Sequence, residues 1–197
     1  MLAELASRDK LLHRVLHRLL SPVLDRLFEA GSMGFRPGRS TADARRLVLK
    51  HVRDGCAWVV EADIAGFFDA IEWDLLEAAL DKALPRADTQ LRELLRQAVR
   101  TPLEIQGRPV TRTKGLLQGS PLSPLLANVF LDAFDEAALA AKLRLVRYAD
   151  DFLILCRDED EARQALETVR SLLVPFRLEL KLEKTAITPI AATPSSS

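Results

Sequence analysis

The sequence predicts an α+β fold in which helices pack against one face of an antiparallel sheet. Two observations predict the sheet: polar and apolar residues alternate along residues 57–64, and the apolar runs 143–146 and 152–156 flank a short acidic turn. The third observation is the helical periodicity of the segments around them. We expect residues 1–190 to form a single unit and residues 191–197 to be a disordered tail.

The first fifty residues are expected to be mainly helical. Residues 11–28 read as helices interrupted at Ser21-Pro22, because proline fits the start of a new helix. A loop with glycine and proline follows over residues 31–40. The next helix is expected to run from Thr41 to Asp54, with Gly55 closing it.

The middle and the end of the chain add helices and short strands. Residues 73–84 and 89–99 have helical periodicity, and residues 103–110 read as a small hairpin with Gly107 in its turn. A helix is expected to begin at Pro121, with Ser120 as its cap. A helix over residues 158–173 and two short strands complete the expected fold.

Acidic residues follow the two predicted strands. Asp63 ends the strand of residues 57–64 on its polar face, and the turn Tyr148-Ala149-Asp150-Asp151 carries two adjacent carboxylates. Adjacent ionised carboxylates repel unless a cation or a basic group neutralises them. If the two strands pair, three carboxylates converge at a place that suits two Mg²⁺ ions. Taken alone, each motif has an ordinary alternative, a solvated strand end or an acidic turn.

The segment from Gln118 to Asn128 combines a flexible loop with a helix start. Gly119 allows a close backbone approach, and the free N–H groups at the start of the helix could face a phosphate or a nucleotide template. A capped structural helix after a loop is the alternative.

Four blocks in this order resemble the reverse transcriptases of bacterial group II introns and their CRISPR-associated relatives. The blocks are Gly34-Phe35-Arg36-Pro37-Gly38-Arg39-Ser40, Asp63-Ile64-Ala65-Gly66-Phe67-Phe68-Asp69, Gln118-Gly119-Ser120-Pro121-Leu122-Ser123-Pro124-Leu125-Leu126-Ala127-Asn128 and Tyr148-Ala149-Asp150-Asp151. A weaker block at residues 178–185 and Arg8-Asp9-Lys10 extend the resemblance to about residues 8–188. It implies a polymerase-type palm over most of residues 57–190 and partial fingers over about residues 1–56.

The resemblance also implies the roles of particular residues. Asp63, Asp150 and Asp151 correspond to the catalytic metal carboxylates, with the Ile64 carbonyl as a further ligand, for two Mg²⁺ ions that Mn²⁺ could replace. Phe68 corresponds to the aromatic residue that excludes a 2′-hydroxyl and so selects deoxynucleoside triphosphates. Three further residues complete the nucleotide-binding set. Gln118 and Gly119 correspond to residues beside the nucleotide and template, and Lys184 corresponds to one near the primer end or the departing pyrophosphate. For Lys184, a solvated strand lysine is the alternative.

The implied partners are an RNA template and a DNA primer. The sequence departs from the family at both ends, where we expect most of the strand pair that grips the triphosphate, and the thumb, to be missing. A protein partner could supply thumb or integrase function. The competing interpretations are a catalytically silent RNA-binding remnant or accessory subunit and an RNA-copying RNA polymerase, against which Phe68 argues.

Charge and composition add a template surface and a compartment. The net charge is zero, but residues 1–56 hold eleven Lys or Arg against six Asp or Glu. Arg36 and Arg39, in a loop, are the candidates for contact with the template backbone. The remaining basic residues of interest are expected on the solvent face of a helix: Arg45, Arg46 and Lys50.

The two cysteines, Cys56 and Cys156, flank apolar strands and are expected to be buried free thiols. The three histidines have no partners in metal-binding spacing and receive no chemical role. No apolar run is long enough to cross a membrane and no signal-peptide pattern is present, so we expect a cytoplasmic protein without a membrane partner.

Overall fold

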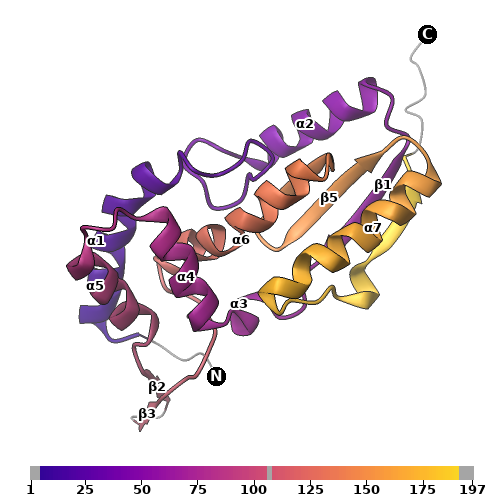
Figure 1. The fold of residues 1–197 in the computed structure, drawn as a ribbon. Coiled ribbons are helices and arrows are strands. Elements are labelled where there is room, and N and C mark those ends of the chain that lie inside the picture. Colours follow the sequence, from indigo (N-terminus) through magenta and orange to yellow (C-terminus); the bar gives the residue numbers. More distant parts are fainter. Residues whose placement is uncertain (1–4, 106–107, 191–197) are drawn as a thin grey trace.

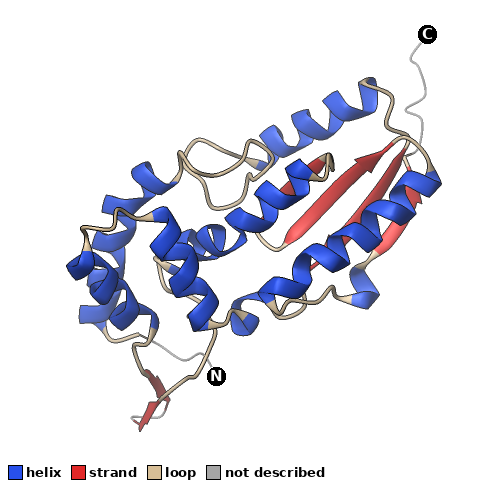
Figure 2. Ribbon diagram, in the orientation of Figure 1, coloured by secondary structure: helices blue, strands red, loops and turns tan. Residues whose placement is uncertain are grey.

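A four-stranded antiparallel sheet forms the centre of the fold. The structure, a computed structural model, describes residues 5–105 and 108–190. The strand order is β4-β5-β1-β6 (Figure 2). The strands are β1 (Trp58–Asp63), β4 (Leu145–Tyr148), β5 (Asp151–Cys156) and β6 (Ala186–Pro189). The α+β prediction and the hairpin around the acidic turn are confirmed.

Two long helices, α6 (Ser123–Ala140) and α7 (Glu159–Leu173), cover one face of this sheet (Figure 1). The alternation of strand residues explains why, since every second side chain of β1 and β5 is apolar and points to this face. The rings of Phe134 on α6 and Phe152 on β5 pack with their centroids 5.8 Å apart. This side of the sheet contains most of the hydrophobic core.

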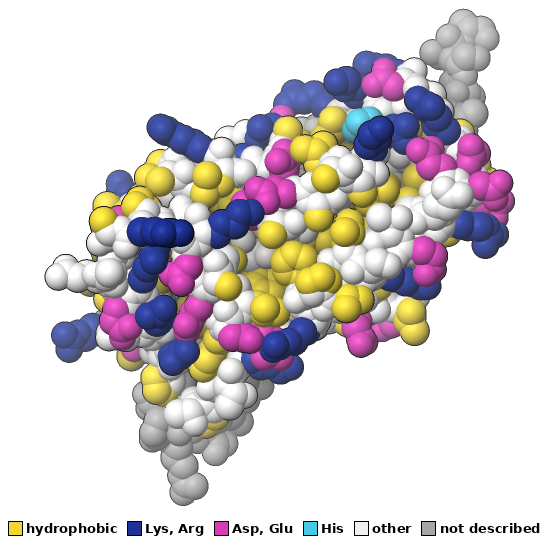
Figure 3. Space-filling view, in the orientation of Figure 1, with side chains coloured by type: hydrophobic (Ala, Val, Ile, Leu, Met, Phe, Trp, Pro, Cys, Tyr) yellow, Lys and Arg dark blue, Asp and Glu magenta, His cyan; other side chains and the backbone are white. Residues whose placement is uncertain are grey.

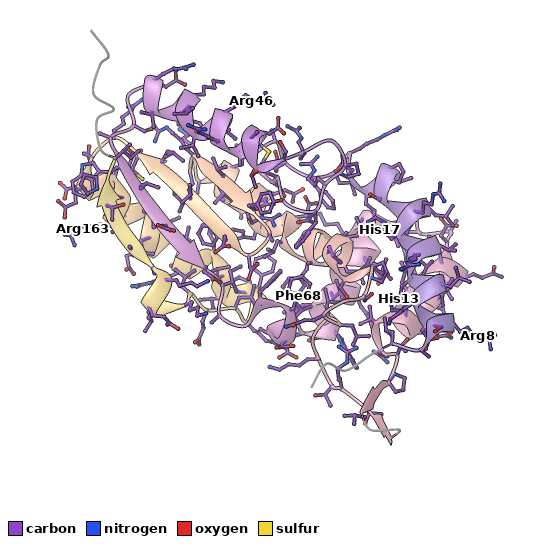
Figure 4. All side chains as sticks on the ribbon, turned by 180° about the vertical axis from the view of Figure 1, so that it is seen from behind. Arg8, His13, His17, Arg46, Phe68 and Arg163 are labelled. Atoms are coloured by element: carbon purple, nitrogen blue, oxygen red, sulfur yellow. The ribbon has the colours of Figure 1, made fainter. Side chains whose placement is uncertain are left out.

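The opposite face is covered at one end by α2 (Thr41–Arg53). A small apolar cluster joins helix and sheet, with Val146 and Leu155 packed near Leu47 and Val48. Seen from behind, the strands lie in front of the core helices and α2 follows their upper edge (Figure 4). Lys and Arg side chains gather along α2 in the space-filling view (Figure 3), as expected for its solvent face.

A helical region lies beside the sheet. It contains α1 (Ser7–Leu24), the short α3 (Phe67–Ala70), α4 (Trp73–Ala83) and α5 (Thr89–Val99). The ladder of β2 (Leu103–Ile105) and β3 (Arg108–Val110) confirms the small hairpin, although Gly107 lies outside the described residues. Two 3₁₀ turns, η1 (Val174–Phe176) and η2 (Leu182–Lys184), connect α7 to β6. The expected tail at 191–197 also lies outside the described residues.

Three expected boundaries were wrong. Pro22 does not interrupt α1 but occupies its last turn, where a missing N–H removes a single helical hydrogen bond while Leu20 and Leu24 stay buried on one stripe. The helix expected from Pro121 begins at Ser123, and Ser120 is not its cap residue, because its hydroxyl accepts from the Leu122 N–H before the helix and contacts His13. Residues 178–185 form a single bridge, Ile64 to Leu180, followed by the turn η2, so they supply only a bridge and β6 supplies the one strand.

Both cysteines are buried and unpaired, as predicted. Within residues 5–105 and 108–190, no helix combines the length and apolar character needed to span a bilayer.

Candidate active site

The sheet places Asp63 and Asp151 directly opposite each other. They are Cα partners at the ends of the antiparallel strands β1 and β5, so their side chains leave the same face of the sheet. Asp150 precedes Asp151 in the turn, and its carbonyl oxygen accepts a hydrogen bond of 3.3 Å from the Ile64 N–H. The N–H and C=O of one strand residue point to the same side, so the Ile64 carbonyl also faces this turn. The pairing therefore brings together the backbone of all four residues that the sequence predicted as metal ligands.

Asp63 is buried and already has a cationic partner. The Lys184 ammonium, on η2, donates to Asp63 Oδ2, and this bond raises the pKa of Lys184. The bridge between Ile64 and Leu180 leads the chain to this position, and the Lys181 N–H donates to the Asp63 carbonyl over 2.8 Å. A buried carboxylate needs such compensation, because burial without a partner is costly.

The pKa of Asp150 is raised, as expected for a carboxyl group close to other acids. Burial raises its pKa first, and the neighbouring charges of Asp63 and Asp151 raise it further. Across the described part of the chain, no three His, Cys, Asp or Glu side chains are arranged to hold a metal ion together. The strands thus bring the three acids to one place, but Asp63 is engaged by Lys184 instead of sharing a cluster. The candidate donors, carboxylate oxygens and one backbone carbonyl oxygen, are of the kind that hard divalent cations prefer.

Phe68 lies on α3, directly after the strand of Asp63. It is half-buried, whereas its neighbour Phe67 is a core residue. Figure 4 shows Phe68 where the sheet meets the helical region. Its ring packs edge to face with Phe35, at 6.4 Å between centroids. Phe35 is 44% exposed and has a left-handed backbone (φ +58°), and the sequence reasoning missed it. A large apolar residue inside the polar loop of Gly34 and Arg36 was the available signal.

The loop with Gln118 and Gly119 is exposed and tied to α3. The Leu116 N–H donates to the Phe68 carbonyl over 2.7 Å, which places the start of this segment beside Phe68. Gly119 has φ +84°, and an added Cβ would meet nothing within 4 Å, so the turn needs its flexibility and leaves space beside it.

Ser120 links this loop to helix α1. It is buried, and its hydroxyl contacts His13 Nδ1 on α1 at 2.7 Å and accepts from the Leu122 N–H. His13, labelled in Figure 4, has a pKa lowered by burial, and it was left without a role in the sequence reasoning. Its spacing along α1 carried no signal for a partner 107 residues away.

The predicted template contact of Arg36 is wrong. Arg36 is buried, and its guanidinium bonds the Asp25 carboxylate at 2.7 Å and the carbonyls of Asp25, Glu29 and Ser32. These bonds hold the loop in place and leave no free face for a phosphate. Arg39, three residues on, is exposed and stays a candidate.

A cleft of about 590 Å³ opens between α2 and the sheet, on the face away from the core. Val48 and Leu153 line its apolar walls, and Tyr148 and Asp151 lie at its acidic end. The cleft therefore leads along the sheet to one of the three predicted metal ligands.

The family described as "Reverse transcriptase (RNA-dependent DNA polymerase)" matches residues 1–192, nearly the whole chain. This chain belongs to the reverse transcriptase family. Among relatives, the group II intron-encoded protein LtrA of Lactococcus lactis subsp. cremoris is 32% identical over 139 residues, which are 71% of this chain and 23% of that protein. The protein YkfC of Escherichia coli (strain K12) is 28% identical over 92% of this chain and 58% of its own length. This reverse transcriptase chain thus spans well under two thirds of both relatives.

Solved structures of telomerase share the fold. The apo telomerase of Candida tropicalis truncated from its C-terminal domain aligns with 96% of this reverse transcriptase chain and 41% of its own, at a TM-score of 0.61 and 14% identity. Telomerase from Candida albicans, in complex with a fragment of telomeric RNA, aligns with 94% of this chain at a TM-score of 0.62 and 15% identity. The α+β fold is therefore of the polymerase palm type.

Proposed function

We propose that this chain is the nucleotide-joining core of an RNA-directed DNA polymerase that works with two Mg²⁺ ions, for which Mn²⁺ can substitute. The observation that carries the proposal is the register of β1 and β5, which sets Asp63 opposite Asp151 and beside the Asp150 turn. The carboxylates of these residues and the Ile64 carbonyl would hold the ions. Bound there, the ions would activate the primer hydroxyl and stabilise charge on the departing oxygens.

Lys184 would then change its partner when metal ions bind. Its bond to Asp63 compensates a buried charge, and cations at the carboxylates would take over that compensation. The ammonium, whose side chain is 51% exposed, is then free to turn toward the triphosphate or the departing pyrophosphate. Lys184 would thus neutralise Asp63 when no ion is bound at the site. With ions bound there, it would bind phosphate oxygens instead.

The other candidates divide between nucleotide and template. The half-buried ring of Phe68 supports a filter against the 2′-hydroxyl, because a bulky ring leaves no room for it. Gln118 and Gly119, exposed on a loop bonded to Phe68, would contact the nucleotide and template. Arg39 would contact the template backbone, and this contact should weaken with salt.

The proposed partners are an RNA template, a DNA primer and deoxynucleoside triphosphates. The intron-encoded relative and the RNA-bound telomerase support an RNA template. Because the chain spans only part of its relatives, we propose that neighbouring regions or a protein partner supply the thumb or an integrase. A cytoplasmic location is a separate proposal.

Primer extension tests this function. The purified protein, alone and with the regions or partner encoded beside it, is given a DNA primer on an RNA template. We expect extension with deoxynucleotides in Mg²⁺ or Mn²⁺ and none in a metal chelator. Asp150→Asn should abolish extension while the thermal unfolding midpoint stays near that of the wild type, because it removes one charge at the turn.

Asp160→Asn is the matched control. It makes the same change at an exposed position in the first turn of α7, and it should extend the primer normally. Equal extension by Asp150→Asn would contradict the metal assignment. Ribonucleotides incorporated as fast as deoxynucleotides would contradict the role of Phe68. Salt-sensitive RNA binding without extension in any combination would favour a catalytically silent subunit.

A further inference from the structure

The acidic turn rests on a buried network centred on Arg147. This residue, on β4, has no exposed surface, and its guanidinium forms an ion pair with Asp135 of α6, at 2.8 Å from Nε to Oδ1. Nη1 donates to the Ala149 carbonyl over 2.8 Å and to Asn128 Oδ1 over 3.2 Å. Nη2 donates to the Ser32 hydroxyl over 2.8 Å. One side chain thus joins α6, the loop before α2 and the turn itself.

Ala149, the residue that Arg147 holds, has an unusual conformation. It is buried and its backbone is left-handed, with φ +61°. For a residue with a Cβ, this conformation costs on the order of 1 kcal/mol and persists only when its surroundings fix it. The direction in which Asp150 leaves the turn depends on this residue, because Asp150 follows it directly. The Arg147 bond to the Ala149 carbonyl is therefore placed to set the direction of a proposed metal ligand.

Gly34 closes the network from the other side. A Cβ at Gly34 would lie 2.3 Å from the Ala149 nitrogen, so only glycine lets this loop approach the turn. The Gly34 carbonyl accepts a hydrogen bond of 2.9 Å from Asn128 Nδ2, and Asn128 also contacts Arg147. Turn, loop and helix are thus locked together by one amide and one guanidinium.

We propose that Arg147, held by Asp135, is a positioning residue that fixes Ala149 in its left-handed conformation and so directs Asp150 toward the cation site, with Gly34 as the opposing contact. The inference rests on the proposed function, since it takes Asp150 as a metal ligand. A buried ion pair is weak evidence for stability by itself, because desolvation offsets the attraction. Because this ion pair surrounds the turn, its proposed role is instead to fix the direction of the Asp150 side chain.

A pair of glycine substitutions separates positioning from stability. Gly34→Ala pushes a methyl group against the turn, whereas Gly55→Ala places an alanine at a left-handed position (φ +97°) between α2 and β1, away from the turn. Both variants should lose similar stability in thermal unfolding. The distinguishing measurement is the dissociation constant for Mn²⁺, followed by electron paramagnetic resonance of the free ion.

We expect Gly34→Ala to weaken Mn²⁺ binding on the order of tenfold, as loss of residues that orient metal ligands commonly does. Gly55→Ala should stay within about twofold of the wild type, because Gly55 precedes β1 at the end of the strand away from Asp63. In primer extension, Gly34→Ala should need a correspondingly higher Mg²⁺ concentration and recover its rate when Mg²⁺ is in excess. If Gly34→Ala does not fold, Asn128→Ala replaces it, since it removes two bonds of the network and adds no volume.

The outcomes separate this inference from the function on which it rests. If Mn²⁺ binds the wild type and Asp150→Asn loses it, but Gly34→Ala or Asn128→Ala binds normally, the network around the turn does not position Asp150 and the proposed function stands. Equal weakening in Gly55→Ala would also overturn the inference, since general destabilisation would then explain it. If Asp150→Asn binds Mn²⁺ as well as the wild type, the metal assignment falls, and this inference falls with it.

Discussion

Asp135 and Asp63, the two buried carboxylates of the described residues, have cationic partners that differ in how easily they can leave. The side chain of Arg147 is completely buried against Asp135, whereas that of Lys184 is 51% exposed beside Asp63. Removing Arg147 would strand a buried charge, but the exposed Lys184 ammonium can return to water at little cost once cations compensate the charge of Asp63. The permanent pair thus supports the turn, and the exchangeable pair occupies the proposed metal site.

A third acid, Asp132 on α6, has no such partner. Its Oδ1 is buried without a hydrogen bond, while the nearby Lys82 pairs with Glu136. Burial first, and then the charges of Glu136 and Asp135, raise the pKa of Asp132 to about 6. The folded protein therefore binds this proton more tightly than the unfolded chain does, and stability attributable to Asp132 falls as the pH rises from about 4 to about 6.

Asp132→Asn should remove that loss. At pH 7 we expect the variant to be more stable than the wild type by about 1–2 kcal/mol in urea unfolding. At pH 4 the difference should vanish, because the wild-type carboxyl is then protonated in the folded state. A difference that is the same at both pH values would show that titration of Asp132 is not its cause.

The stability of helix α2 depends strongly on the capping of its first turn. None of its residues is fully buried, and Ser40 and Asp43 form a reciprocal capping box at its start. The hydrogen bonds from Ser40 and Arg46 lower the pKa of Asp43 to about 2, so the box stays ionised at neutral pH. This helix forms one wall of the cleft beside the sheet, and its order therefore bears on the site.

Ser40→Ala should cost about 1 kcal/mol in the free energy of unfolding, the usual effect of losing such a cap. Thr41→Ala is the control, because it changes the next exposed residue and leaves the box intact. Chemical denaturation of both variants measures the difference. Equal stability of the two variants would show that the box does not anchor α2.

Elements with strong local signals could be predicted from the sequence, and those fixed by distant contacts could not. The alternation of residues 57–64 predicted β1 closely, and the helix expected from Thr41 to Asp54, closed by Gly55, matches α2. Pro22 was misread as a break, because buried leucines on both sides of it keep α1 continuous. Likewise the bond between Lys184 and Asp63 was not predicted, because it depends on the bridge from Ile64 to Leu180, which brings Lys184 on η2 to Asp63.

The candidate site follows the same division. Local patterns identified Asp63, Asp150 and Asp151, and antiparallel pairing was enough to bring them together. Arg36 was misjudged because its partners, Asp25 and Glu29, lie on an earlier segment whose path the sequence does not reveal. The support of the turn by Arg147 was missed for the same reason, since it spans residues from Ser32 to Ala149.

At the scale of the molecule, the order of the strands in the sheet explains where the candidate acids lie. β1 and β5 lie side by side in the middle of the sheet, flanked by β4 and β6, so Asp63 lies opposite Asp151 while α6 and α7 cover the other face (Figure 1). Lys184 reaches the same point from the segment that precedes β6. The central claim is that this point binds divalent cations.

Crystals grown with Mn²⁺ and examined by anomalous scattering test that claim most directly. We predict Mn²⁺ bound by the carboxylates of Asp63 and Asp150, with the Lys184 ammonium moved away from Asp63. Mn²⁺ bound only elsewhere, with the bond between Lys184 and Asp63 intact, would contradict the account.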